Sequence, residues 1–398
     1  MTRFLRYGLL AAALAAMVSA QASGQVPKLK KLKDAAKKVV TKPAAPAATD
    51  TAAAEPAAAA PADAAKPAGR ADPKVWENYD FVPGNKVLFY TDFTEDKVGN
   101  FARRLKYKSG PLEVVERDGA KVLRATGRST FLIPIGGKLP ERFTLEIDVI
   151  APEPTDGEHD VSQMLVFEGG PEENHGAQSA EVTWSTSLAW IKGGGQNPPA
   201  SNVVVPPAMR PLLRSHVGHL RVLMDGPYFK MYVNERRLYN IPELPVPRDS
   251  VIRVALNASE NEVVYLTSIR VAESETDVLY DALAANGRWA TQGILFETGK
   301  SDLRPESRPV LKEIASTLTE HADLSVLIEG HTDNVGSPAS NLALSEARAA
   351  AVKAALVADF AIAPERITTK GLGDTKPAVP NTTAEGRAQN RRVEIVKQ

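Results

Sequence analysis

The chain has 398 residues, enough for two folded domains together with segments that do not form a core. Its 48 Lys and Arg residues are matched by 48 Asp and Glu residues, so no global basic field indicates a nucleic-acid partner. There is no cysteine, which excludes disulfides, thiolate zinc sites, cysteine nucleophiles and the lipid-modified cysteine of a lipoprotein.

Histidine ligands for a metal are also scarce. Six histidines are scattered along the chain, and only His216 and His219 lie close together in sequence. At the entry to a strand their side chains point to opposite faces, which does not favour a shared metal ion. We therefore expect no metal and no cofactor.

The N-terminal segment has the pattern of a secretory signal peptide. Arg3 and Arg6 precede an apolar run over 8–18, and small residues follow it. We predict a signal peptide over 1–23, and the alternative is an uncleaved membrane anchor. The predicted disordered linker over 24–73 begins with a lysine-rich run, Lys28–Lys42, which is either a solvated leader or a helix on an anionic surface. Its remainder is rich in Ala and Pro, which favours an extended chain.

Residues 75–272 alternate short apolar runs with turn residues, as in antiparallel sheets. Asp118-Gly119 and Asp225-Gly226 are the strongest turn signals. Roughly a dozen strands at this length predict an all-β jelly-roll sandwich of two sheets. The runs LFYTDFTED, RFTLEIDV and HLRVLMDGPYFKMYVNERRLYNIP, in this order, resemble the concanavalin A-like lectin/glucanase sandwich.

The run RFTLEIDVIAPE places two carboxylates on one strand face. Phe143, Leu145, Ile147 and Val149 face one way, and Glu146 and Asp148 the other. Paired carboxylates are what a glycosidase needs. The resemblance to glucanases implies the pattern E-x-D-x-x-E, but Ala151 replaces the third carboxylate, so the alternative is an ordinary solvated strand face.

Three aromatic residues of the predicted sandwich invite two interpretations. They form either a sugar-stacking surface or part of the core. These residues are Trp184, Trp190 and Tyr239.

Near the C-terminus a strand, a polar turn and a helix follow one another. The strand is predicted over 324–329, the turn over 330–336, and the helix from Asn341 onward. The helix positions expected on the buried face are Leu344, Ala347, Ala351, Val352 and Ala355. Arg348 lies within that face, and an unpaired guanidinium there is costly. We therefore expect Arg348 to have a carboxylate partner, either Asp333 or a group of a ligand.

The rest of this region predicts a compact α+β domain over 290–398, after a hinge over 273–289. A strand is expected within 287–297, a helix over 302–318, and strands over 367–371 and 393–396. The predicted order is β-α-β-α-β-β, so the chain as a whole is expected to be multidomain.

The runs IEGHTDNVGSPASNLALSEARAAAVKAAL and RITTKGLGDTKPAVPNTTAEGRAQNRRVEI resemble the C-terminal peptidoglycan-binding domain of OmpA-like outer-membrane proteins. The resemblance covers Leu295 to Val396. It implies that Asp333 binds the ammonium and Arg348 the carboxylate of diaminopimelate in a peptide stem. The other implied pocket residues are Thr332, Asn341, Leu344, Asn390 and Arg391. The alternatives are an internal Asp333–Arg348 salt bridge and, for Arg391, a plain surface charge.

These observations favour a non-catalytic envelope protein of the periplasm or cell outer membrane that binds peptidoglycan. Its sandwich is expected to face a second envelope ligand, either a glycan or another outer-membrane component. A wall-targeted glycoside hydrolase using Glu146 and Asp148 is the alternative. A transmembrane barrel is not expected, because the predicted strands are short and rich in charges.

Overall fold

The computed structural model describes residues 79–150, 163–168, 180–184, 188–192, 201–204, 217–244, 246–248, 251–274 and 279–398. The predicted signal peptide and linker lie outside these residues, as do Ala151, His216 and the side chains of Trp184 and Trp190. All of the described residues belong to one compact unit. Within it we call 79–274 the sandwich and 279–398 the C-terminal domain.

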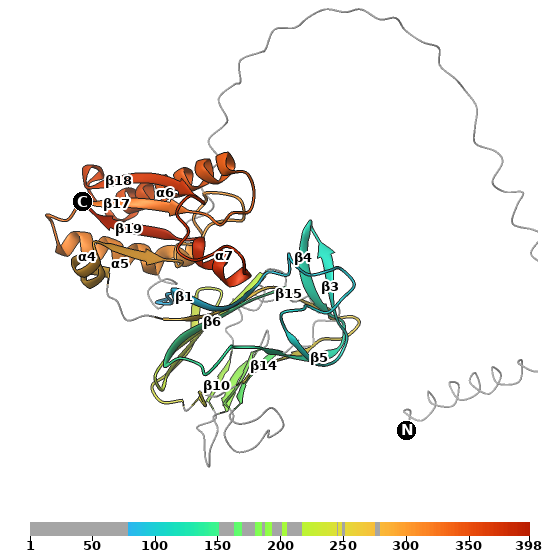
Figure 1. Ribbon diagram of the computed structural model, residues 1–398. Helices are drawn as coiled ribbons and strands as arrows, with labels where there is room; N and C mark the ends of the chain where they lie inside the picture. The colour runs from blue at the N-terminus through green and yellow to red at the C-terminus, as the bar shows by residue number, and fades with distance from the viewer. Residues whose placement is uncertain are drawn as a thin grey trace, which may run out of the picture. The chain divides into compact units, whose positions relative to one another are not determined.

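The sandwich consists of two antiparallel sheets (Figure 1). The first contains, in spatial order, β13 (Arg236–Ile241), β12 (Tyr228–Val233), β11 (Val217–Asp225), β6 (Arg142–Ile150), β15 (Val264–Glu273), β4 (Ala120–Ala125) and β3 (Leu112–Arg117), with β1 (Lys86–Thr91) also paired to β15. The second contains β10 (Ser201–Val204), β9 (Leu188–Lys192), β8 (Ala180–Trp184), β7 (Gln163–Glu168), β14 (Val251–Asn257), β5 (Arg128–Ile133) and β2 (Lys106–Ser109).

Alternation along the strands explains this arrangement. The four apolar residues of β6 predicted to share a face are all buried, and they pack against residues of the second sheet such as Phe167 and Val254. Tyr239 is also a core residue. The predicted turn at Asp118-Gly119 is confirmed, with φ of 52° and 78° between β3 and β4. The jelly-roll topology and the resemblance to concanavalin A stay predictions.

The C-terminal domain has a four-stranded sheet in the order β16-β19-β17-β18. Its elements are α4 (Leu279–Asn286), β16 (Arg288–Thr291), η2 (Pro305–Ser307), α5 (Arg308–Glu320), β17 (Val326–His331), α6 (Pro338–Phe360), η3 (Pro364–Arg366), β18 (Ile367–Gly373), α7 (Ala384–Asn390) and β19 (Val393–Lys397). Figure 1 shows β18, β17 and β19 side by side. A short helix was expected within the hinge, where α4 lies, but the predicted order omitted α7.

Two predicted boundaries near the loop were wrong. The central strand continues to His331, because its amide donates to the carbonyl of Arg392 at 3.0 Å and thereby extends the pairing with the neighbouring chain. The helix begins at Pro338 rather than Asn341, because the hydroxyl of Ser337 accepts a hydrogen bond from the amide of Ser340 and caps it.

The predicted buried face of α6 was wrong for Leu344, Ala347 and Ala351, whereas Val352 is buried and Ala355 packs against the core. The residues that are buried are Asn341, Ser345, Ala349, Val352 and Leu356. The reason is close contact with the sheet. A Cβ added to Gly330 would lie 2.3 Å from the carbonyl oxygen of Ser345, and one added to Gly371 would lie 2.5 Å from the amide nitrogen of Glu346. Glycines in the sheet therefore select the face of the helix that carries small side chains.

In the described part of the chain, no helix has both the length and the apolar character needed to cross a membrane.

Candidate functional site

The loop that carries Asp333 leaves the end of β17 and is fixed by backbone bonds. The amide of Thr332 donates to the carbonyl of Gly373 at 2.9 Å. The carbonyl oxygen of Asp333 accepts bonds from the hydroxyl of Thr332 at 2.8 Å and the side-chain amide of Asn341 at 3.2 Å. Thr332 and Asn341, two of the predicted site residues, thus hold the main chain of the loop and set the position of Asp333.

The carboxylate of Asp333 is buried and has two partners inside the domain. Its Oδ1 accepts from the amide of Val335 at 3.0 Å, and its Oδ2 accepts from Arg391 at 2.6 Å. Only 8% of Asp333 is exposed. The internal salt bridge is therefore made by Asp333 and Arg391. The alternative of a bridge between Asp333 and Arg348 was wrong, because Arg348 forms no ion pair with any described residue.

Arg348 lies on α6 with its positive charge uncompensated. Its Nε donates to the carbonyl of Lys300 at 3.0 Å, and its guanidinium carbon lies 4.9 Å from the centre of the Phe296 ring. Burial and the nearby charge of Arg391 hold the pKa of Arg348 below its usual range, and Asp333 opposes this only in part. A carboxylate bound at this guanidinium would relieve both effects.

Arg391 connects this loop to the sandwich. Its guanidinium carbon lies 4.9 Å from the centre of the Tyr90 ring on β1. Burial lowers the pKa of Arg391, but Tyr90 and Asp333 outweigh it, so the pKa lies above its usual range. Burial also raises the pKa of Tyr90 to about 12, so the ring stays neutral. Sequence reasoning missed Tyr90, because no local pattern distinguishes it from other strand aromatics.

Asn390 and Leu344 lie beside these charges in different roles. The Asn390 side chain is fully buried, accepts bonds from the amides of Ala378 and Val379 at 2.8 and 3.1 Å, and donates to the carbonyl of Val379 and the side chain of Asn381. These bonds fix the loop before α7. Leu344 is half-buried on α6.

Arg348 and Arg391 both line a cavity of about 820 Å³. Residues of the sandwich, including Tyr90 and Asp92, form another part of its wall. Asp333 and the other predicted site residues are not among those that line it. The guanidinium groups rather than the carboxylate are thus presented to this space.

The sandwich carboxylates Glu146 and Asp148 share a face, as predicted, but this face lines the cavity and its charges are paired. Glu146 is only 9% exposed and pairs with Arg270 and Arg221. Asp148 accepts bonds from Arg221 at 2.7 Å, His219 at 2.8 Å and Ser268 at 3.0 Å.

These pairings oppose general acid chemistry. Burial raises the pKa of Asp148, but Arg221 and His219 outweigh it and hold the pKa far below its usual range. A glycosidase needs one carboxyl with a raised pKa to protonate the leaving group. Glu146 and Asp148 therefore form an ion-pair network with Arg221 and Arg270, in place of an ordinary solvated strand face.

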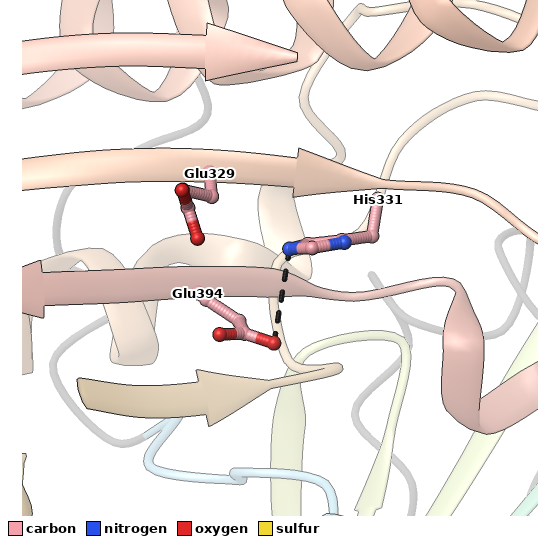
Figure 2. Close-up of side chains that lie close together, drawn as sticks. All are labelled: Glu329, His331 and Glu394. Carbon is pink, nitrogen blue, oxygen red and sulfur yellow. Dashed lines mark ion pairs between the residues drawn. The ribbon is translucent and has the colours of Figure 1, made fainter. Parts of the chain in front are cut away.

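A second group of polar side chains lies on the sheet of the C-terminal domain. Figure 2 shows Glu329 and His331 on β17 and Glu394 on β19. One possible ligand atom from each of the three side chains lies within 4.8 Å of the others. Glu394 already accepts bonds from Arg392 at 2.7 Å and Arg288 at 2.8 Å. Two guanidinium groups thus supply the positive charge that a cation would bring.

His331 in this group is almost completely buried, with 3% exposed. Burial, assisted by the charge of Arg392, lowers its pKa to about 4, so the imidazole is neutral at physiological pH. Its Nε2 lies 3.7 Å from Glu394. The cluster is therefore a charge-balanced part of the sheet rather than an acidic pocket.

The geometry thus defines an α+β domain with a buried acid on a strand-end loop and an uncompensated arginine on the next helix. Residues 295–391 match the model of the OmpA family, so this segment is an OmpA-family domain, and the resemblance expected from the sequence is confirmed for it.

Similar proteins come from several bacteria. Outer membrane protein A of Bordetella avium is 50% identical over 101 residues, 25% of this chain and 51% of that protein. The peptidoglycan-binding protein ArfA of Mycobacterium bovis is 44% identical over 103 residues, 26% of this chain and 31% of that protein. The solved peptidoglycan-associated lipoprotein from Burkholderia pseudomallei is 29% identical, with 31% of this chain and 100% of that chain covered and a TM-score of 0.26. The chain therefore spans about half or less of the length of these two curated relatives.

Proposed function

We propose that this protein is a non-catalytic component of the cell envelope whose C-terminal domain binds peptidoglycan without a covalent bond. The observation that carries the proposal is Arg348, a partly buried guanidinium that faces a cavity and has no carboxylate partner among the described residues. Its OmpA-family domain and its similarity to a protein named as peptidoglycan-binding support the same conclusion.

The ligand group we infer is the diaminopimelate of the peptide stem, whose free end carries an ammonium and a carboxylate. Arg348 would bind the carboxylate through two parallel hydrogen bonds. Asp333 would accept the ammonium while it remains bonded to Arg391, since a carboxylate has acceptor sites for both. Thr332 and Asn341 hold the loop, and Leu344, Asn390 and Arg391 shape its surroundings.

The place of action that follows from this ligand is the periplasm or the inner side of the outer membrane, where peptidoglycan is accessible. The sandwich would then face a second envelope component, a glycan or a constituent of the outer membrane. Glu146 and Asp148 do not support the alternative of a glycoside hydrolase, because both carboxylates form ion pairs with Arg221 or Arg270.

The test is binding to purified sacculi and to a soluble stem tripeptide that contains either diaminopimelate or lysine. We expect the intact chain to bind the diaminopimelate peptide at least about tenfold more tightly, because the lysine peptide lacks the carboxylate for Arg348. Asp333→Asn should weaken binding, whereas the control Asp359→Asn, an exposed acid on the same protein, should not. Equal binding of the two peptides, or none of either, would contradict the proposal.

A further inference from the structure

The cavity at Arg348 has walls from both the C-terminal domain and the sandwich. Strand β1 lies against α7, since the amide of Tyr90 donates to Glu385 at 3.2 Å and Arg391 stacks on the Tyr90 ring. Arg104 and Arg387 add ion pairs across the same contact, to Glu385 and Glu95. The sandwich is therefore placed to contribute side chains to whatever occupies the cavity.

Most charged groups that line the cavity already have a partner of opposite charge. Arg391 pairs with Asp333, and the remaining pairs join Arg221 with Asp148, Arg270 with Glu146, Arg304 with Glu306, and Arg392 with Glu394. Three lining groups form no ion pair with any described residue: Arg348, Lys121 and Asp92. Arg348 comes from the C-terminal domain, and the other two come from the sandwich.

Lys121 and Asp92 are held in place by neutral groups of β1 and of the loop that follows it. The ammonium of Lys121 donates to the carbonyls of Thr94 at 2.9 Å and Asp96 at 2.7 Å. The carboxylate of Asp92 accepts bonds from the hydroxyl of Thr94 at 2.6 Å and the phenol of Tyr90 at 3.3 Å. Both residues are half-buried, so each charge loses part of its hydration and gains no ion pair in return. Such charges are positioned for a ligand and need little rearrangement when it binds.

We propose that Lys121 and Asp92 complete the peptide-binding site, and this inference rests on the proposed function. Lys121 binds a second carboxylate of the stem peptide, the α-carboxylate of its isoglutamate, while Arg348 binds that of diaminopimelate. Asp92 supplies an acid for the ammonium on the cavity wall, which Asp333 does not line, and the charge of Asp333 is largely balanced by Arg391. The sandwich then acts as part of the receptor for the wall peptide, in addition to any ligand of its own.

The test is calorimetry of the full chain with the soluble tripeptide L-Ala-γ-D-Glu-diaminopimelate. We expect Lys121→Gln and Asp92→Asn each to weaken binding by about tenfold, the size of one charged contact. Two controls remove the same charges elsewhere in the sandwich: Lys138→Gln, at an exposed position, and Asp118→Asn, in the β3–β4 turn, where Asn tolerates the positive φ of 52°. Both controls should bind within about twofold of the unchanged chain.

A change in the peptide tests the same contact without a protein variant, so that misfolding of a variant cannot explain the result. The unchanged chain should bind the tripeptide amidated at isoglutamate about tenfold more weakly, and Lys121→Gln should bind both peptides equally. If the amidated peptide binds as tightly as the acid, or if the Lys121 and Asp92 variants bind normally while Arg348→Met does not, this inference is wrong and the proposed function stands. If the unchanged chain binds no tripeptide, both are wrong.

Discussion

The substitution Arg348→Met should affect ligand binding and leave stability nearly unchanged, because the positive charge of Arg348 contributes little to the free energy of unfolding. The charge-assisted bond to the carbonyl of Lys300 and the contact with the Phe296 ring contribute about 1.5–3 and about 0.5–1 kcal/mol. Against them stand the loss of hydration and the repulsion from Arg391, which together lower the pKa of Arg348. Methionine keeps the apolar stem in place. Because Arg348 is half-exposed and solvent screens its charge, we expect the free energy of unfolding to change by less than about 1 kcal/mol.

The same substitution should abolish most of the binding. Removing one member of a desolvated charge pair costs about 2–5 kcal/mol, which raises the Kd for the diaminopimelate tripeptide at least about 30-fold. Urea denaturation measures the first quantity and calorimetry the second. Arg308→Met is the matched control, since Arg308 also lies over an aromatic ring, that of Phe360, but is exposed and lines no part of the cavity.

Two results would refute this reasoning. A destabilisation of more than about 3 kcal/mol would mean that the charge of Arg348 is structural after all. An unchanged Kd in a folded Arg348→Met variant would mean that the carboxylate of the ligand is bound elsewhere.

Three further changes test the fold around the site. Gly330→Ala should lower the free energy of unfolding by about 1–3 kcal/mol or more, because the new Cβ would lie 2.3 Å from the carbonyl oxygen of Ser345. The control is Gly136→Ala, whose new Cβ would have no neighbour within 4 Å. Equal melting temperatures of the two variants would contradict the packing of α6 on the sheet. Between pH 6.5 and about 4, His331 is protonated in the unfolded chain and neutral in the folded one, so the free energy of unfolding should fall by up to about 3 kcal/mol as the pH drops through this range. If the free energy of unfolding of His331→Asn depends on pH as steeply as that of the unchanged chain, this prediction is wrong. Asn390→Leu should cost about 1–3 kcal/mol in urea denaturation, since it removes the bonds that the buried Asn390 side chain makes to the backbone of Ala378 and Val379. Retained stability would show that water replaces these bonds.

The sequence was sufficient to predict the strand, loop and helix around Asp333, because their signals are local. It was insufficient for the partner of Asp333. Arg391 lies 58 residues further along the chain and reaches the loop because β19 pairs with β17, bringing Val393 opposite Gly330. No spacing rule connects two residues that meet through sheet pairing. The choice between an internal bridge and a ligand therefore needed coordinates.

The face of α6 could not be predicted for a different reason. In an alanine-rich helix the contrast between apolar and polar faces is small, so periodicity carries little information. The deciding feature lies in other elements: Gly330 on β17 and Gly371 on β18 leave space only for the side of the helix that carries Ser345. Arg348 consequently lies at the edge of the buried face, half-exposed and accessible from the cavity.

Sheet pairing also explains why alternation gave the wrong environment for Glu146. The pattern correctly placed Glu146 and Asp148 on the face opposite the core. Register decides the rest, since Glu146 on β6 stands between Arg221 on β11 and Arg270 on β15. Opposite charges on adjacent strands stabilise one another, and here they do so on the face that lines the cavity. Two carboxylates on one strand therefore indicate catalysis only when the neighbouring strands leave their charges free.

Asp333 and Arg348 differ in whether their charge is already paired within the protein. Asp333 already has a guanidinium partner at 2.6 Å, so an incoming ammonium must share it. Arg348 has none among the described residues, so an incoming carboxylate gains the interaction without displacing a protein group. Electrostatic selection should thus act first on the carboxylate of the ligand. The ammonium contributes more once a second, unpaired acid is present, and within the described wall of the cavity Asp92 is the residue in that position.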